Sequence, residues 1–396
     1  MTTTTLSSAR AFAGLQVQPP DPLLSLIRLY NEDPRASKID LGVGVYRDEA
    51  GGTPIMRAVK AAEQKLLNTQ PTKAYLGPEG DLAYLDAIRP VIFGPGGGTD
   101  FFAMQTPGGT GALRLAAALA AAGRADAKVW LGTPSWPIHA QIFAAAGLKT
   151  QTFAAFDVAT QATAIDSLMA ALGQAEAGDL VLLHGCCHNP TGADLTLDQW
   201  RAVTKVIADR GIVPIVDLAY QGLGDGLDED AAGLRHLVQH VETVIVAYSF
   251  DKNFALYRER TGAIFVRTPG QQPTVNSNLL QIARGAWSMP PDHGAAVVRL
   301  ILEDAALAAD WRAELDEMRA RLNGLRHDLA DAHPRLEPLR DQRGLFALLP
   351  FSPAQVEAIR RDHAVYMAGS GRINVAGLNG ESLPRFVAAF EAVLNG

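Results

Sequence analysis

The stretch LVLLHGCCHNPTGADLTLDQWRAVTKVIADRGIVPIVD, residues 180–217, decides the fold. It begins with a short apolar run, continues through a polar loop into a helix-period segment at residues 195–210, and ends in a second apolar run. A buried strand, a helix and another buried strand in this order are typical of a parallel sheet covered by helices. The stretch therefore predicts an α/β fold that binds its ligands beyond the carboxyl ends of the strands.

The same alternation continues on both sides of this stretch. Further apolar runs suited to buried strands lie at Val129–Leu131, Val244–Tyr248 and Ala263–Val266, and Leu234–His240 has the period of a helix. The segment Asp304–Asp331 is rich in Ala, Leu, Glu and Arg, and it predicts one long helix that leads into a smaller C-terminal region.

Composition excludes several classes of protein. Of the 396 residues, 48% are hydrophobic and 19% are charged, which excludes a disordered chain and a coiled coil. The net charge of −7 gives no global attraction to nucleic acid or an anionic membrane. No apolar run approaches the ~20 residues that span a bilayer. Residues 1–16 are polar and lack the core of a secretory signal, so we expect a flexible leader, with a transit peptide as the alternative.

Lysine is scarce: 8 of the 35 basic residues are lysine, and only Lys252 lies beyond Lys205. Lys252 follows the run VIVAYSF, at the end of an expected strand. Burial would lower the pKa of such an amine and make it a nucleophile that forms a Schiff base with a carbonyl cofactor. The alternative is a lysine whose stem packs at the strand end while its amine reaches solvent.

Other candidate residues also follow expected strands. Asp217 suits a protonated ring nitrogen of a cofactor, or the cap of a turn or helix. Trp136 suits stacking on a flat ring, or packing in the core. The glycines and Thr110 of TPGGTGAL, residues 106–113, open a helix-period run and suit a phosphate, or form an ordinary loop and helix cap.

Three arginines, Arg260, Arg284 and Arg372, lie in apolar or glycine-rich surroundings. Each suits bidentate capture of a phosphate or carboxylate, with a surface ion pair as the alternative. His184 and His188 bracket two thiols, but the segment begins on a strand and Asn-Pro follows at once, so we expect no metal. The missing GxGxxG fingerprint disfavours a nicotinamide-dependent dehydrogenase.

The two cysteines, Cys186 and Cys187, are adjacent in the chain and have no other cysteine to pair with. They offer no disulfide framework, so we expect a reducing, cytoplasmic location.

From about Asp21 to the C-terminus, the chain resembles the class I, fold-type I pyridoxal-phosphate aminotransferases, specifically the aspartate and aromatic amino-acid group. The resemblance implies a three-layer fold, with a mostly parallel seven-stranded sheet in a large cofactor-binding domain, residues 49–314. Residues 17–48 and 315–396 are then a smaller α/β domain. The motifs that carry the resemblance are, in chain order, DPRASKIDLGVGVYRDE, KAYLGPEG, TPGGTGAL, PSWPIH, HGCCHNPTGADLTLDQW, DLAYQG, SFDKNFALYRERTG and SGRINVAGLN.

The resemblance implies roles around the cofactor ring. Lys252 matches the lysine that holds pyridoxal phosphate as a Schiff base and later moves the substrate proton. Asp217 matches the acid that pairs with the ring nitrogen, which preserves the electron sink. His139 matches a residue that supports this acid. Asn189 and Tyr220 match the partners of the cofactor's 3-oxygen.

The resemblance also implies how the cofactor phosphate is held. The backbone of Gly109 and the side chains of Thr110, Ser249 and Arg260 match its ligands within one subunit. Tyr75 matches a tyrosine that reaches the phosphate of the neighbouring subunit.

For the substrate, Arg372 matches the arginine that grips the α-carboxylate, and the backbone at Gly44 is expected to close over the same group. Trp136 matches the ring that stacks on the cofactor, and it faces the substrate together with Asn189. Arg284 matches the arginine that receives a side-chain carboxylate from the other subunit. The resemblance therefore implies a homodimer with active sites shared across the interface.

Five positions depart from the pattern of the group. Gly108 and Asp251 stand where serine is common, Ile138 where asparagine is common, Ala255 where glycine is usual, and Trp287 where tyrosine is frequent. Because adjacent residues in an extended segment point apart, we expect Asp251 to have little effect on the lysine that follows it.

These residues predict ping-pong transamination between an amino acid and 2-oxoglutarate. Arg284 favours dicarboxylic substrates, while GDGLDEDAAGLR and YRERTG look closest to bacterial aromatic-type members. We therefore expect dual use of aspartate and of aromatic Phe, Tyr or Trp. The alternatives are a strict aspartate aminotransferase, another pyridoxal-phosphate activity such as β-elimination or decarboxylation, and a non-catalytic binder. No basic patch or DNA-binding segment supports a nucleic-acid partner.

Overall fold

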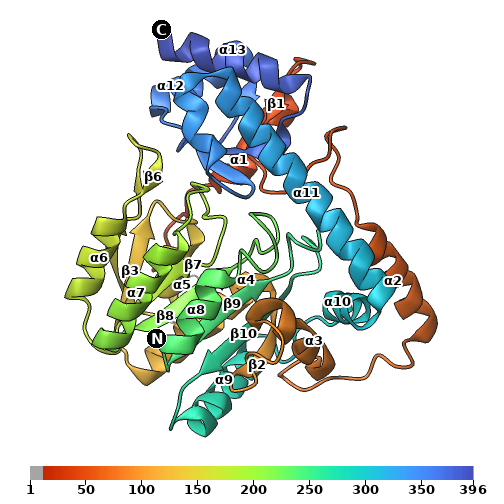
Figure 1. Ribbon diagram of the computed structural model, residues 1–396, viewed down its shortest axis with the longest axis vertical. Helices are drawn as coiled ribbons and strands as arrows, with labels where there is room; N and C mark the ends of the chain where they lie inside the picture. Colours follow the sequence, from red (N-terminus) through yellow and green to blue (C-terminus); the bar gives the residue numbers. More distant parts are fainter. Residues whose placement is uncertain (1–11, 396) are drawn as a thin grey trace, which may run out of the picture.

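A computed structural model describes residues 12–395 of the chain. Its centre is a seven-stranded sheet in the order β2-β10-β9-β8-β7-β3-β4 (Figure 1). β10 is antiparallel to both of its neighbours, and all other neighbouring strands are parallel. The predicted mostly parallel sheet of seven strands is therefore confirmed. Its strands are β2 (Phe102–Pro107), β3 (Lys128–Thr133), β4 (Lys149–Ala154), β7 (Leu180–His184), β8 (Val213–Leu218), β9 (Val244–Ser249) and β10 (Thr261–Arg267).

Helices cover both faces of this sheet, because successive residues of a strand point to opposite sides. Ile215 and Ile245 pack into one apolar core, and Val216 and Val246 pack into another. The first core is covered by α4 (Gly108–Gly123), α5 (Ile138–Ala145) and α9 (Gln272–Ala286). The second is covered by α2 (Arg57–Thr69), α3 (Leu82–Phe93), α6 (Ile165–Gln174), α7 (Leu197–Arg210), α8 (Ala232–His240) and α10 (His293–Glu303).

The sequence explains where these helices begin and end. In α7, Thr196 and Gln199 form a capping box, and Gly211 ends the helix in the left-handed conformation at φ 66°. The return into β8 follows directly, so this unit is the strand, helix and strand that the sequence predicted.

The long helix α11 (Ala305–Ala332) connects the sheet to a third apolar core (Figure 1). Trp311 packs with the sheet side, whereas Leu329 packs in the third core. The predicted long helix is confirmed, and it continues through Gly324. The elements at the far end are α1 (Pro22–Glu32), β1 (Ile39–Asp40), the 3-10 segment η2 (Pro334–Arg340), β11 (Phe346–Leu348), α12 (Pro353–His363), β12 (Val365–Tyr366), β13 (Arg372–Asn374), η3 (Val375–Gly377) and α13 (Ser382–Asn395).

Segments from both ends of the chain build this far end. β1 pairs parallel with β12, and β11 pairs antiparallel with β13. A short hairpin, β5 (Phe156–Asp157) and β6 (Ala162–Thr163), rises from the sheet side toward it.

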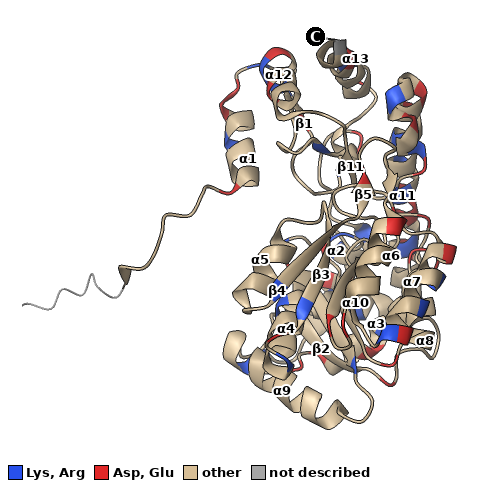
Figure 2. Ribbon diagram, turned by 90° about the vertical axis from the view of Figure 1, so that its left-hand side faces the viewer, with Lys and Arg blue, Asp and Glu red and all other residues tan. Residues whose placement is uncertain are grey.

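The chain ahead of α1 leads away from the rest of the molecule, and residues 12–21 are exposed along their whole length (Figure 2). Of the predicted leader, residues 1–11 lie outside the described part of the chain. No helix within residues 12–395 has the length and apolar character needed to cross a membrane.

Candidate active site

One cavity of about 330 Å³ lies at the carboxyl ends of the central parallel strands, where the fold predicts a ligand. Most of the predicted site residues meet there, although they come from positions 44 to 372 of the chain. The predicted residues that line it are Gly44, Gly109, Thr110, Trp136, Asn189, Asp217, Tyr220, Ser249, Lys252, Arg260 and Arg372.

Lys252 enters the cavity from the turn that follows β9. Its Nζ lies 5.4 Å from the centroid of the Tyr220 ring, and 19% of the side chain is exposed. Burial lowers the pKa of this amine, while the carboxylates of Asp251 and Asp217 act in the opposite direction. A lowered pKa makes a larger fraction of the amine neutral and nucleophilic at neutral pH.

The expectation that Asp251 would point away from Lys252 is wrong. Residues 251–254 form a turn and not an extended segment, so the alternation of a strand does not apply. The Oδ2 of Asp251 lies 3.8 Å from the Nζ of Lys252, and the same oxygen pairs with the guanidinium of Arg260. Asp251 is therefore part of the electrostatics of the site.

Asp217 lies at the end of β8, and its Oδ2 is 2.9 Å from the Nε2 of His139. A line of hydrogen bonds fixes which group donates. The backbone N–H of Asn189 donates to Nδ1 of His184 at 3.4 Å, so Nε2 of that neutral ring carries the proton. It donates to Ser135 Oγ at 3.3 Å, and the Ser135 hydroxyl donates to Nδ1 of His139 at 2.8 Å.

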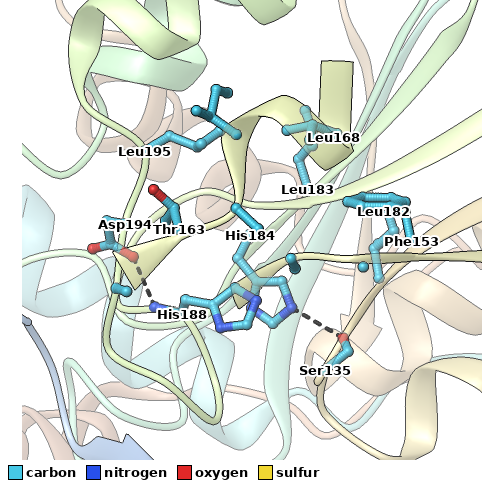
Figure 3. A pocket seen from close by; sticks show the side chains of 15 residues that line it. Ser135, Phe153, Thr163, Leu168, Leu182, Leu183, His184, His188, Asp194 and Leu195 are labelled. Atoms are coloured by element: carbon cyan, nitrogen blue, oxygen red, sulfur yellow. Dashed lines mark hydrogen bonds between the residues drawn. The ribbon is translucent and has the colours of Figure 1, made fainter. Parts of the chain in front are cut away.

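The Nε2 of His139 donates to the Oδ2 of Asp217. Burial lowers the pKa of His184 well below its usual value, which keeps this ring neutral. A second, smaller cavity of about 50 Å³ lies beside His184, under the β5–β6 hairpin (Figure 3). The rings of His184 and His188 line it and lie 4.1 Å apart.

Donors suited to an anion gather at one corner of the cavity. The helix α4 begins at Gly108, directly after β2, so its first backbone N–H groups have no partner within the helix. Thr110, Ser249 and Arg260 line the same corner. A Cβ on Gly109 would lie 3.2 Å from the Cβ of Ser249, so a side chain there would narrow the corner. Helix N–H groups, hydroxyls and a guanidinium form a set that suits a phosphate dianion.

Asn189 and Tyr220 form a polar pair in the same cavity, close to Lys252. The Nδ2 of Asn189 donates to the Tyr220 hydroxyl at 3.4 Å, and the Oδ1 of Asn189 is buried without a partner. Burial, and next the charge of Asp217, raise the pKa of Tyr220, so its hydroxyl keeps its proton. Trp136 stands edge-on to His139, with ring centroids 5.1 Å apart.

Arg372 reaches the cavity from β13. One of its Nη atoms donates to the Gly42 carbonyl at 3.0 Å, its guanidinium lies 4.5 Å from the centroid of Phe346, and its Nε is buried without a partner. Burial lowers the pKa of this guanidinium. A Cβ on Gly44 would lie 2.8 Å from the Phe346 ring, so the backbone there is closely packed against the same group. The unused donor is suited to a carboxylate.

Tyr75 and Arg284 are not brought to this cavity by the chain itself. Tyr75 is 94% exposed, and Arg284 is exposed and donates to Ser288 Oγ at 3.0 Å. Neither lines the cavity. Their roles stay predictions that need a second copy of the chain.

Several site residues were not among the predicted ones. Ser135 and His184 lie at or just beyond the ends of β3 and β7, so the rule that pointed to Asp217 also applies to them. Tyr257 accepts the backbone N–H of Tyr46 at 2.8 Å and lines the cavity. Phe346 comes from the far end of the chain, and no local signal marked it.

One group of three side chains within residues 12–395 could reach a single metal ion: Cys186, Cys187 and Asp230. However, the Oδ2 of Asp230 already accepts the N–H groups of Gly222 and Gly224, at 2.7 and 2.9 Å. This acid therefore shapes the loop after Tyr220, and both thiols are free and buried.

Comparison with known proteins agrees with this arrangement. A family profile described as aminotransferase class I and II matches residues 36–390. The chain belongs to this aminotransferase family. It is 53% identical over 379 residues to the tyrosine aminotransferase of Rhizobium meliloti (strain 1021), covering 93% of this chain and 96% of that relative. It is 41% identical over 396 residues to the aspartate aminotransferase of Escherichia coli (strain K12), covering 97% of this chain and 100% of that relative.

A solved structure gives the same picture. The aromatic-amino-acid aminotransferase from Burkholderia pseudomallei, covalently bound to pyridoxal phosphate, superposes with a TM-score of 0.94 at 36% identity, covering 97% of this chain and 99% of that one. The resemblance to the aminotransferases and the three-layer, fold-type I architecture are confirmed, and so is the prediction of an enzyme.

The cofactor of this aminotransferase is pyridoxal 5′-phosphate. The cavity fits that group on its own chemistry. It brings together an anion corner, a carboxylate, Asp217, held by His139, and an amine of lowered pKa, Lys252.

Proposed function

We propose that this aminotransferase exchanges amino groups between an L-amino acid, aspartate or one of Phe, Tyr and Trp, and 2-oxoglutarate in a ping-pong reaction. The observation that carries the proposal is the placement of Lys252 in one cavity with an anion corner and with Arg372, a partly buried arginine whose Nε is buried without a partner. Dual specificity is supported by relatives named for tyrosine and for aspartate.

When bound, pyridoxal phosphate supplies a carbonyl and an electron-withdrawing ring, which are what transamination needs. We assign its phosphate to the N–H of Gly109 and to Thr110, Ser249 and Arg260. Asp217 would then hold the ring nitrogen, and the hydrogen bond from His139 keeps this acid oriented. Asn189 and Tyr220 would hold the 3-oxygen of the ring, and Trp136 would cover one of its faces.

Lys252 carries the proton transfer in this proposal. Its amine, with its lowered pKa, would take the proton from the Cα of the substrate and deliver it to the C4′ carbon of the cofactor. Arg372 binds the α-carboxylate and so sets the direction of the Cα–H bond, while the backbone at Gly44 covers the same group.

We further propose that the enzyme acts as a homodimer, in which Tyr75 and Arg284 complete the site of the partner. The exposure of both side chains, and of Leu67 at 78%, supports a covering copy. Residues 17–48 with 315–396 would form a small domain that closes on a large domain, residues 49–314, and excludes water. We propose a cytoplasmic location and no nucleic-acid or membrane partner.

The test compares Lys252→Ala with Lys205→Ala, a lysine with 74% of its side chain exposed on α7. The purified enzyme should show visible absorbance of its cofactor, which aspartate, tyrosine and phenylalanine each bleach, and it should form one glutamate for each donor consumed with 2-oxoglutarate. Lys252→Ala should lose this absorbance and nearly all turnover, while Lys205→Ala keeps both. Retention of both by Lys252→Ala would contradict the assignment.

The same assays separate the other reactions. Release of ammonia or carbon dioxide in place of glutamate would indicate β-elimination or decarboxylation. Turnover of aspartate without turnover of aromatic donors would indicate a strict aspartate aminotransferase.

A further inference from the structure

Asp251 is a buried acid next to two basic side chains of the site, Arg260 and Lys252, and it is only 3% exposed. Its Oδ2 pairs with the guanidinium of Arg260 and lies 3.8 Å from the amine of Lys252. Its Oδ1 is buried and has no hydrogen-bond partner. A carboxylate oxygen buried without a donor destabilises the fold, so this position is not explained by stability alone.

Because Gly108 has no side chain, there is room beside it for the ion pair of Asp251 and Arg260. Its φ is +67°, in the left-handed region that favours glycine. A Cβ there would lie 2.6 Å from an Nη of Arg260 and 3.4 Å from the Oδ2 of Asp251. A side chain at this position would therefore displace the arginine from the acid, so Gly108 and Asp251 act on the same guanidinium.

The ion pair of Arg260 and Asp251 lies at the corner where the proposed site needs positive charge to bind the cofactor phosphate. Arg260 is the arginine of the anion corner, and in this structure its guanidinium is already paired with a carboxylate. A phosphate that binds the N–H groups of α4 must share Arg260 with Asp251. Two anions on one guanidinium repel each other, and the repulsion is strong where water is scarce.

We propose that Asp251 is an internal counter-ion that competes with the cofactor phosphate for Arg260 and makes the hold on the cofactor reversible. The inference rests on the proposed phosphate site. When the phosphate is absent, Asp251 neutralises Arg260. When the phosphate is bound, Asp251 weakens its binding. The enzyme then exchanges its cofactor more readily than a variant without this charge.

The experiment titrates full-length, cofactor-free protein with inorganic phosphate, pyridoxal phosphate and pyridoxal in a calorimeter. Asp251→Asn keeps the shape of the side chain and an oxygen for Arg260 but removes the charge. Asp228→Asn is the matched control, because Asp228 pairs with Arg235 at 2.8 Å on the surface, with 80% of its side chain exposed. It should bind all three ligands as the unchanged enzyme does.

We expect Asp251→Asn to bind phosphate about tenfold more tightly, since one like charge next to the dianion is removed. The ratio of pyridoxal phosphate affinity to pyridoxal affinity should rise by about the same factor, because pyridoxal lacks the phosphate. A role of Asp251 in stability alone would leave this ratio unchanged.

Equal or weaker phosphate binding by Asp251→Asn would overturn the inference and would mean that Asp251 orients Arg260 for the phosphate. If the unchanged enzyme binds neither phosphate nor pyridoxal phosphate, the proposed phosphate site is itself wrong and the inference falls with it.

A second measurement tests the link to Gly108. Gly108→Ser should change phosphate binding by a different factor in the unchanged enzyme than in Asp251→Asn, because displacing Arg260 from residue 251 separates an ion pair only where the charge of Asp251 is present. The strain of the left-handed backbone is the same in both backgrounds and cancels. Additive effects of the two substitutions would contradict the coupling.

Discussion

The Nε2 of His139 donates a hydrogen bond to the Oδ2 of Asp217 across 2.9 Å, and the residues behind His139 fix the direction of that bond. Behind His139, hydrogen bonds connect its Nδ1 to Ser135, Ser135 to His184, and His184 to the backbone N–H of Asn189. Asn189 itself lines the cavity that Asp217 faces. The two ends of the proposed ring site are therefore joined through the protein as well as through the ligand.

Replacing His139 with phenylalanine should lower kcat/KM for tyrosine by roughly 10- to 100-fold, because a hydrogen bond to a charged group is worth about 1.5–3 kcal/mol. Asp217 would remain in place but would lose the donor that orients it. Steady-state kinetics with 2-oxoglutarate measure the effect. His363→Phe, at the exposed end of α12, is the control and should behave as the unchanged enzyme. An unaltered kcat/KM in His139→Phe would show that Asp217 needs no support.

Arg284→Leu should separate the two substrate classes. If the partner's copy of this arginine receives a side-chain carboxylate, the specificity constant for aspartate should fall by about 100-fold or more, because the carboxylate would lose a charged bidentate partner. The constant for phenylalanine should change by less than about threefold. Arg201→Leu, on the outer face of α7 with 57% of its side chain exposed, is the control. Equal losses for aspartate and phenylalanine would contradict the assignment.

Much of this site could be predicted because the chemistry follows strands that are easy to identify. The run IVPIVD ends in Asp217 and the run VIVAYSF ends two residues before Lys252, and these runs contain the strands β8 and β9 of the sheet. An apolar run that ends in a polar residue marks both the strand and its functional end. The helix α11 was equally clear, because no proline and only one glycine interrupts it.

What could not be predicted depends on contacts between distant segments or on turn geometry. Gly44, Phe346 and Arg372 meet only after β11 and β13 pair, and no local pattern links these positions. The position of Asp251 depends on a turn after β9 that reads as a continuation of the strand. Tyr75 is predicted to act in the site of a partner subunit, and a single chain shows only that its side chain is exposed.

Two glycines should respond to alanine in opposite directions. A Cβ on Gly233, at the start of α8, would lie 2.4 Å from the buried ring of Trp200, so Gly233→Ala should lower the free energy of unfolding by about 1–3 kcal/mol. A Cβ on Gly324, inside α11, would meet no atom within 4 Å. Gly324→Ala should therefore raise the free energy of unfolding by about 0.5–1 kcal/mol, because alanine loses less backbone freedom.

Urea unfolding of both variants at one protein concentration checks this pair, and each variant serves as the control for the other. Stabilisation by Gly233→Ala would show that Trp200 moves aside at little cost. Destabilisation by Gly324→Ala would show that α11 has a neighbour at that point.

Asp194 and His188 are partly buried next to each other and have opposite pKa shifts. The Oδ1 of Asp194 accepts the backbone N–H of His188 at 2.8 Å, and both residues line the smaller cavity (Figure 3). Burial raises the pKa of Asp194 from 3.8 to about 6. Burial lowers the pKa of His188 from 6.5 to about 4. Each shift means that the folded chain disfavours the charged form of the group.

The two shifts should make opposite contributions to stability between pH 4 and pH 6. Over this range the unfolded Asp194 is ionised while the folded one still holds its proton, so its contribution to the free energy of unfolding falls as pH rises. The unfolded His188 holds a proton that the folded one has lost, so its contribution rises with pH. We therefore expect the pair to leave the unchanged enzyme with little net slope over this range.

Removing one partner should expose the slope of the other. Asp194→Asn should become more stable, relative to the unchanged enzyme, as pH rises from 4 to 6.5, and His188→Gln should become less stable over pH 4 to 6, each by roughly 3 kcal/mol for a shift of about two pH units. Free energies of unfolding in urea at pH 4.0, 6.0 and 6.5 measure both changes. The His184 ring lies 4.1 Å from the His188 ring, and His188 contributes to its lowered pKa, so the effect of His184 cancels for Asp194→Asn but not for His188→Gln. Parallel pH profiles for the three proteins would contradict the opposed pair, because neither buried group would then lose or gain its proton on folding.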